Sequence, residues 1–221
     1  PTFVRRNSGV FHMADVKWLG NTCFRIKSRE AMVLMDPIAR DSGMTMPKQK
    51  ADIVTLSMRG RANALANVEG EYTLIEGPGE YEVQEVFLSG IRTRRNGTGG
   101  AQKDFNTVYL VEMDEMIFCH LGSLNKPLTE AQVEAMGDVD VLFVPIGGED
   151  SLSPAGATEV IGQIEPRLVI PMRYKINDEA GKRALGEFAA ALGLTEVPRE
   201  DRLIIRKNTL PETMGVTVLD V

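Results

Sequence analysis

The run VLFVP at residues 141–145 constrains the fold of this 221-residue chain most, because it contains no polar residue. A half-exposed strand alternates apolar and polar residues, whereas this run is typical of a strand buried on both faces. A predicted helix over 154–164 follows, and a second apolar strand is predicted at 168–171. Since a strand buried on both faces needs a layer on each side, we expect helices outside a pair of packed sheets.

The rest of the chain supports a mixed α/β protein in which strands predominate. Thr129 followed by Gln132 predicts a helix start through a capping box, and a further helix over 178–192 ends before Gly193. We predict an N-terminal extension over 1–12 and one domain over 13–221. The other predicted strands are 15–19, 23–27, 31–35, 51–56, 72–75, 81–83, 86–91, 107–111, 116–120, 202–207 and 216–219.

Composition excludes several classes of function. The net charge of −6 argues against nucleic-acid binding, even though residues 92–95 form a basic segment. The sequence contains no apolar run near the roughly 18 residues that span a bilayer, and no apolar signal core follows the basic N-terminus. Cys23 and Cys119 are far apart in strand-like runs, so we expect buried free thiols. These patterns predict a cytoplasmic protein without a membrane or nucleic-acid partner.

Several segments, in order from residue 16 to the C-terminus, resemble the metallo-β-lactamase superfamily, in particular its compact single-domain branch that includes the ascorbate-phosphate lactonase. The resemblance implies a four-layer αββα sandwich and a homo-oligomer. It also implies that Asp36 corresponds to an aspartate beside the metal site. The segments that carry it are 18–26 (WLGNTCFRI), 33–37 (VLMDP), 77–83 (GPGEYEV), 119–122 (CHLG), 142–148 (LFVPIGG) and 165–172 (EPRLVIPM).

Enzymes of this family hold a pair of zinc or manganese ions, and the resemblance places seven metal ligands on this chain. Only His120 matches a ligand residue. Catalytic zinc needs about three protein ligands and an open position, and a guanidinium at a ligand position repels a cation. The sequence therefore predicts no metal cofactor and no standard metal-dependent hydrolysis. Asn21 stands where the family often has a further histidine in its opening strand pair. The other six positions fall on Met58, Gly60, Ala62, Asn63, Ser123 and Arg173, with the loop motif His-x-His-x-Asp-His covering the four from 58 to 63.

Two functional interpretations follow. In the first, the protein is a non-catalytic member of the family, or its former active-site cleft binds a small anion such as a phosphate or carboxylate compound, because guanidinium groups suit such ligands. The arginines can instead pair with local carboxylates or face water. The candidate ligand-binding residues are Arg173, His120, Asn63, Arg59, Arg61 and Ser123.

In the second interpretation, the protein is a hydrolase of esters, lactones or phosphorylated metabolites with a different site around His120. His120 would act as the base, with Ser57, Ser123 or Cys119 as the nucleophile. Cys119 and His120 are neighbours in a strand, so their side chains are expected on opposite faces. The catalytic candidates are therefore His120 and Ser123. We favour the first interpretation, in which the protein is not an enzyme.

Overall fold

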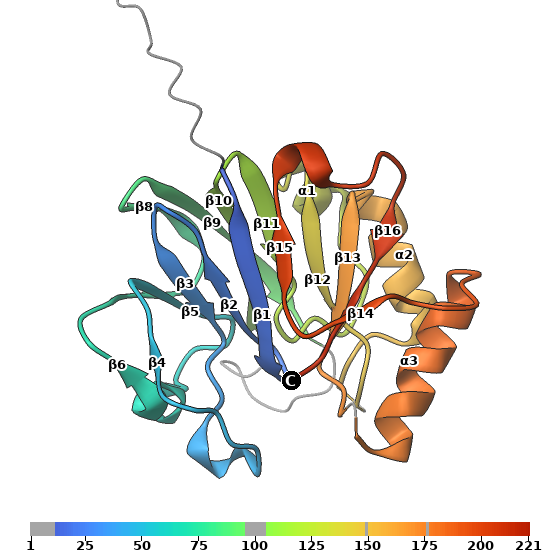
Figure 1. Ribbon diagram of the computed structural model, residues 1–221, viewed down its shortest axis with the longest axis horizontal. Helices are drawn as coiled ribbons and strands as arrows, with labels where there is room; N and C mark the ends of the chain where they lie inside the picture. The colour runs from blue at the N-terminus through green and yellow to red at the C-terminus, as the bar shows by residue number, and fades with distance from the viewer. Residues whose placement is uncertain (1–11, 96–104, 149, 176) are drawn as a thin grey trace, which may run out of the picture.

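The computed structural model describes residues 12–95, 105–148, 150–175 and 177–221. Of the predicted N-terminal extension, only His12 lies within the described residues. Two sheets form the body of the protein, and helices flank one of them (Figure 1). The predicted mixed α/β fold is confirmed.

The first sheet has six strands in the order β15-β1-β2-β3-β5-β7, and the second has seven in the order β16-β13-β12-β11-β10-β9-β8. The first contains β15 (Leu203–Ile205), β1 (Ala14–Gly20), β2 (Cys23–Lys27), β3 (Met32–Met35), β5 (Ile53–Leu56) and β7 (Thr73–Glu76). The second contains β16 (Gly215–Val216), β13 (Leu168–Met172), β12 (Val141–Pro145), β11 (Met116–His120), β10 (Phe105–Met113), β9 (Val86–Arg94) and β8 (Gly79–Val83). Two short pairs join β14 (Arg199–Glu200) to β17 (Val218–Leu219), and β4 (Gln49–Lys50) to β6 (Val68–Glu69).

The apolar runs that predicted buried strands form β12 and β13. All residues of both strands are buried, and the two strands pair in parallel beside β11. Helices α2 (Pro154–Ile164) and α3 (Glu179–Ala191) lie outside this sheet, on the right in Figure 1. The predicted capping box opens α1 (Glu130–Glu134), where the Thr129 side chain accepts from the Gln132 N–H.

A shared apolar core fills the space between the sheets. The Phe24 ring of β2 lies 4.2 Å from the Phe143 ring of β12, centroid to centroid, and Trp18 and Phe118 extend the same aromatic group. Each of these side chains is at most 1% exposed. Burying a side chain of this size stabilises the fold by about 1.5–3 kcal/mol, so the contact fixes how the sheets face each other.

The outer face of the six-stranded sheet is covered by turns instead of long helices. Cys23, Leu34 and Val54 point away from the main core and pack with Met46 and Leu65 in a second apolar cluster. The covering segment includes η1 (Arg40–Ser42) and η2 (Ala62–Asn67), while η3 (Lys207–Thr209) follows β15. The fourth layer of the predicted sandwich is thus built from 3-10 turns and short strands.

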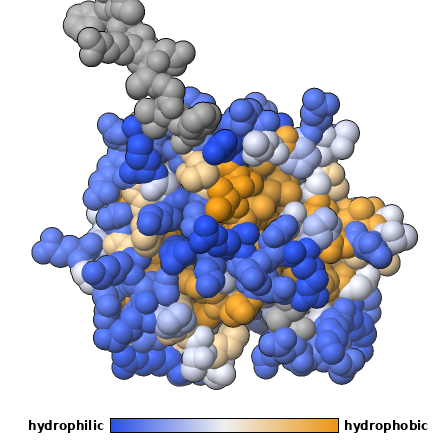
Figure 2. Space-filling view, in the orientation of Figure 1, coloured by the Kyte–Doolittle hydropathy of each residue, from blue (hydrophilic) through white to orange (hydrophobic). Residues whose placement is uncertain are grey.

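Both cysteines are buried and free, which confirms the predicted thiols. Among the described residues, no helix has the length and apolar character needed to cross a membrane. Figure 2 shows hydrophilic side chains over most of one face, with a hydrophobic area in its upper middle over β15. Strand β15 carries Ile204, which is 47% exposed.

Candidate functional site

Two adjoining pockets lie where several strands end. The inner pocket is lined by Asn21 and Thr22 after β1, Asp36 after β3, Met58 and Arg61 after β5, and Ser123 after β11. The outer pocket has a volume of about 350 Å³, and its lining includes Asn21, Arg173, Lys175 and Asp178. Because β3 and β5 run parallel, as do β11, β12 and β13, their final residues meet at the same edge.

Asp36 is the carboxylate of the inner pocket. It directly follows β3, and its Oδ1 accepts the backbone N–H of Ser57 at 2.6 Å. This bond fixes one carboxylate oxygen to the segment that leaves β5. The Asp36 side chain is therefore held in place by the neighbouring parallel strand.

Three pocket residues other than glycine have left-handed backbone: Asn21 (φ 52°), Asp36 (φ 45°) and Arg173 (φ 65°). The other left-handed residues of this kind in the described chain lie in two hairpin turns and at the end of α2. Asn21 also lies in a turn, between β1 and β2. Asp36 and Arg173 have no such explanation, and strained backbone of this kind concentrates at functional sites.

Arg95 supplies a buried guanidinium next to the inner pocket. It is 8% exposed, its Nε donates to the Ser123 carbonyl at 2.9 Å, and its Nη1 contacts the Met58 Sδ at 3.8 Å. Its Nη2 lies 3.3 Å from the Asp150 carboxylate. The guanidinium thus bridges the inner pocket and the segment after β12.

Arg173 places a second guanidinium close to the first. Its Nη1 donates to the Asp150 carbonyl at 2.6 Å, and its backbone N–H donates to the Asn21 carbonyl at 2.8 Å. Burial lowers the pKa of Arg173, and so do the nearby charges of Arg95 and Arg61, while Asp150 opposes them. Burial is the largest of these effects on the pKa, and the Asp36 carboxylate opposes them as well.

His120 is enclosed beneath this region and lines neither pocket. Its Nε2 lies 2.8 Å from the Thr22 carbonyl, its ring contacts Phe24 and Phe143, and its buried Nδ1 has no hydrogen-bond partner. Burial lowers the pKa of His120, so the ring is neutral at pH 7 and donates its Nε2–H to Thr22. In this structure the side chain joins the two sheets.

The structure brings together some of the predicted site residues and not others. Ser123 and Arg61 line the inner pocket, and Arg173 lines the outer one. Arg59 is exposed and packs against Gly77, and Asn63 is exposed on η2. The last two do not line either pocket.

Arg95 was missed because residues 92–95 were considered only as a basic segment. Along the end of β9, Thr93 and Arg95 are buried, whereas Arg92 and Arg94 are exposed and lie over the Phe105 ring. A period of two residues therefore separates an inward arginine from two outward ones. That alternation was the available signal.

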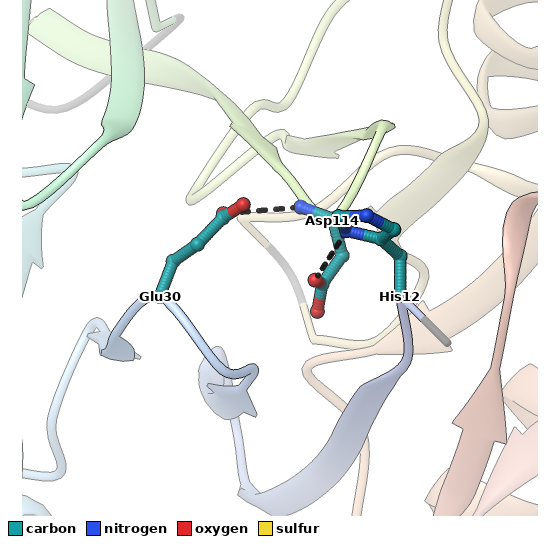
Figure 3. Close-up of side chains that lie close together, drawn as sticks. All are labelled: His12, Glu30 and Asp114. Atoms are coloured by element: carbon teal, nitrogen blue, oxygen red, sulfur yellow. Dashed lines mark hydrogen bonds and ion pairs between the residues drawn. The ribbon is translucent and has the colours of Figure 1, made fainter. Parts of the chain in front are cut away.

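The side chains best suited to bind a metal ion lie away from the two pockets. The inner pocket offers one carboxylate among guanidinium groups, a donor set that does not suit a pair of metal ions. Within the described ranges, the one group of three histidine, cysteine or acidic donors is His12, Glu30 and Asp114, whose ligand atoms lie within 4.8 Å of one another. Figure 3 shows the three side chains converging.

Comparison with known proteins gives consistent matches. The family model described as the beta-lactamase superfamily domain matches residues 15–173. A UPF0173 protein of Pyrococcus furiosus is 29% identical over 182 residues, which cover 75% of this chain and 85% of the relative. A UPF0173 metal-dependent hydrolase of Pyrococcus horikoshii is 24% identical over 214 residues, covering 80% and 94% of the two chains.

Among solved structures, a candidate Zn-dependent hydrolase of the metallo-beta-lactamase superfamily from Thermotoga maritima matches with a TM-score of 0.76 and 30% identity. The match covers 94% of this chain and 98% of the other. The predicted resemblance and sandwich fold are confirmed.

The same findings contradict two predictions. The names of the relatives, as metal-dependent hydrolases, contradict the prediction of a non-catalytic protein that has lost its metal site. Those names and the His12 group contradict the prediction of no metal cofactor. His12, Glu30 and Asp114 do not occupy the family's ligand positions; they are far apart in the chain and are brought together by folding.

Proposed function

The chain belongs to the family described as the beta-lactamase superfamily domain, and we propose that it is a hydrolase of small anionic substrates. The substrate class is esters, lactones or phosphorylated metabolites that carry a phosphate or carboxylate group. Cytoplasmic location and a homo-oligomeric state, without nucleic-acid or membrane partners, belong to the same proposal.

One observation carries the proposal: three guanidinium groups gather at the pockets, and the acidic groups placed against them are Asp36 and Asp150. Arg95 lies 3.3 Å from the Asp150 carboxylate, Arg173 donates to the Asp150 backbone carbonyl, and Arg61 lines the inner pocket. Removing guanidinium groups from water is costly unless opposite charge compensates. A phosphate or carboxylate supplies that charge and matches the planar donors of arginine.

In this proposal the substrate occupies both pockets. The outer pocket, at about 350 Å³, falls within the range of known small-molecule sites. It adjoins the N-terminus of α3, where Asp178 caps the helix, and Lys175 adds positive charge to its wall. In this proposal the body of the substrate occupies the outer pocket, and the bond to be cleaved lies over Asp36 in the inner pocket.

Asp36 then acts as the general base. Its carboxylate accepts a proton from the attacking water, and the bond between the carbonyl or phosphoryl centre and the leaving oxygen breaks. The leaving oxygen takes up a proton, directly or through water, so that the reaction consumes one water. Guanidinium groups stabilise the negative charge that develops on the reacting centre. The Ser57 N–H orients Asp36, and His120 supports the pocket wall through Thr22.

The relatives' names imply a metal, but the donors of the inner pocket do not fit one. His12, Glu30 and Asp114 are the described residues whose donors would hold an ion. A bound divalent ion can act as a Lewis acid where substrate reaches it.

Arg173→Asn tests anion binding, since asparagine tolerates the left-handed backbone at this position while the charge is removed. Arg183→Gln is the matched control, because Arg183 is an exposed arginine of α3 paired with Glu187. Inorganic phosphate binding, measured by isothermal titration, should weaken about 10- to 100-fold in the first variant, as expected for a lost charge-assisted contact. The control should bind like the parent. Equal phosphate affinity in all three proteins would contradict the site.

Two further variants separate binding from reaction. Asp36→Asn should retain phosphate binding and lose hydrolysis in a panel of esters, lactones and phosphomonoesters. Asp150→Asn removes the acidic partner of Arg95 and should strengthen phosphate binding. If the parent protein, assayed with and without added Zn²⁺ or Mn²⁺, hydrolyses no member of the panel, the proposed reaction is wrong even if the anion site stands.

A further inference from the structure

We propose that His12, Glu30 and Asp114 bind one divalent transition-metal ion that clamps the two sheets together at the end remote from the pockets. We call this group the clamp site. The inference is independent of the proposed hydrolase function, because it concerns a different end of the molecule.

The clamp site joins three segments of both sheets. His12 lies two residues before β1, and Glu30 lies in the turn between β2 and β3, so both adjoin strands of the six-stranded sheet. Asp114 lies in the turn between β10 and β11 of the seven-stranded sheet. The Asp114 backbone N–H donates to Glu30 Oε2 at 3.1 Å, and Figure 3 shows the His12 ring on the other side of Asp114. An ion bound here would therefore cross-link the sheets.

Asp114 is the observation that points to a ligand. The residue is 1% exposed, its side chain is fully buried, and neither carboxylate oxygen has a hydrogen-bond partner. Its ion-pair partner is His12, whose Nδ1 lies 3.4 Å from Oδ1. The positive charge of Arg29 also acts on this carboxylate. Burial raises the pKa of Asp114, and so does the neighbouring Glu30 carboxylate. A buried carboxylate without donors is costly, and a bound cation removes that cost.

The donor set selects the class of metal. One imidazole nitrogen with two carboxylates suits Zn²⁺, Co²⁺ or Mn²⁺, whereas Ca²⁺ takes six to eight oxygen ligands. His12 and Glu30 are half-buried, so water can complete the coordination sphere. The buried Nδ1 of His12 has no hydrogen-bond partner either, which leaves it available to the ion.

The site is too far from the pockets to activate water there. Asp114 and His120 lie at opposite ends of the β11 region, and six residues at about 3.3 Å each separate them by about 20 Å. The ion would therefore act on the stability of the fold and not on the substrate.

The test uses the full chain, stripped of metal with a chelator, and titrated with Co²⁺ and Zn²⁺. The parent should bind one equivalent, with Co²⁺ absorption bands that Zn²⁺ displaces, and its thermal midpoint should rise with Zn²⁺ concentration. Asp114→Asn and His12→Gln should bind at least about 100-fold more weakly, since each removes a direct ligand. Glu115→Gln is the control, because this exposed residue neighbours Asp114 in the same turn.

Several results would overturn the clamp site. One is a stripped parent that binds no metal; another is an Asp114→Asn variant that binds it as well as the parent. If His12 serves only as an ionic partner of Asp114, His12→Gln should lower stability equally with and without Zn²⁺. Asp114→Asn removes a buried charge and should therefore be at least as stable as the metal-free parent. A loss of metal binding in this variant thus cannot be attributed to unfolding. Phosphate affinity should stay unchanged in all clamp variants.

Discussion

Tyr109 and Tyr174 are both buried, but only the Tyr109 hydroxyl forms hydrogen bonds. Replacing each by phenylalanine therefore measures how much these hydrogen bonds contribute to the free energy of unfolding, with Tyr174 as the control. Tyr109 is fully buried, and its Oη accepts the N–H of Gly77 at 2.8 Å. The same hydroxyl lies 3.2 Å from the Leu56 carbonyl and 3.3 Å from that of Ile75. Tyr174 is 5% exposed, and its buried hydroxyl has no hydrogen-bond partner.

Tyr109→Phe should destabilise the protein by about 2–4 kcal/mol. The Gly77 N–H loses its acceptor in a buried position, which costs about 1–3 kcal/mol, and the hydroxyl's own donated bond contributes about 1 kcal/mol. Tyr174→Phe removes a hydroxyl that is already unsatisfied, so the change in the free energy of unfolding should lie between zero and about 1 kcal/mol of stabilisation.

Urea unfolding followed by circular dichroism measures both values. With a slope of about 2 kcal/mol per molar, the midpoint of Tyr109→Phe should fall by about 1–2 M, while that of Tyr174→Phe should stay or rise. Equal losses in the two variants would refute the reasoning, because they would trace the cost to ring packing and not to hydrogen bonds. Since Tyr109 holds β10 to the end of β5, Tyr109→Phe should also weaken phosphate binding at the inner pocket.

Three other results are expected. Gly122→Ala should cost about 2–4 kcal/mol in urea unfolding, because a Cβ there would lie 2.5 Å from Ser57 Oγ on a backbone with φ of 60°, and wild-type stability would contradict this. Burial lowers the pKa of His120, so on acidification the unfolded chain takes up this proton at a higher pH than the folded chain. The free energy of unfolding should therefore fall by up to about 1.4 kcal/mol per pH unit below about pH 6.5. His120→Gln should reduce this slope. Burial raises the pKa of both Cys23 and Cys119, so a thiol reagent should label neither until urea unfolds the chain, and rapid labelling of the native protein would show that the core opens.

Local sequence patterns predicted much of the architecture because each depended on neighbouring residues. The unbroken apolar run at 141–145 specified β12, and the pairing of Thr129 with Gln132 specified the start of α1. The layer that covers the six-stranded sheet was not predicted in detail, because Met46 and Leu65 find their contacts only across the fold.

The candidate site was predicted in part, for a similar reason. Ser123 and Arg173 follow recognisable strands, so their arrival at the pockets could be expected from the resemblance. Arg95 reaches Asp150 through a contact between segments 55 residues apart, and His12 reaches Asp114 over a longer separation. Contacts of this kind depend on tertiary structure, which no local pattern encodes.

The two ends of the sandwich carry side chains of opposite charge: guanidinium groups at the pockets and carboxylates at the clamp site. At the pocket end, Arg95 pairs with the Asp150 carboxylate and Arg173 donates to the Asp150 backbone carbonyl, and the proposed substrate adds the anion there. At the other end, Asp114 and Glu30 face one imidazole, so a cation is missing. The two sites are about 20 Å apart along β11, a distance at which the effects of mutations usually add independently. A metal requirement and an anionic substrate are thus compatible in one chain without the metal touching the substrate.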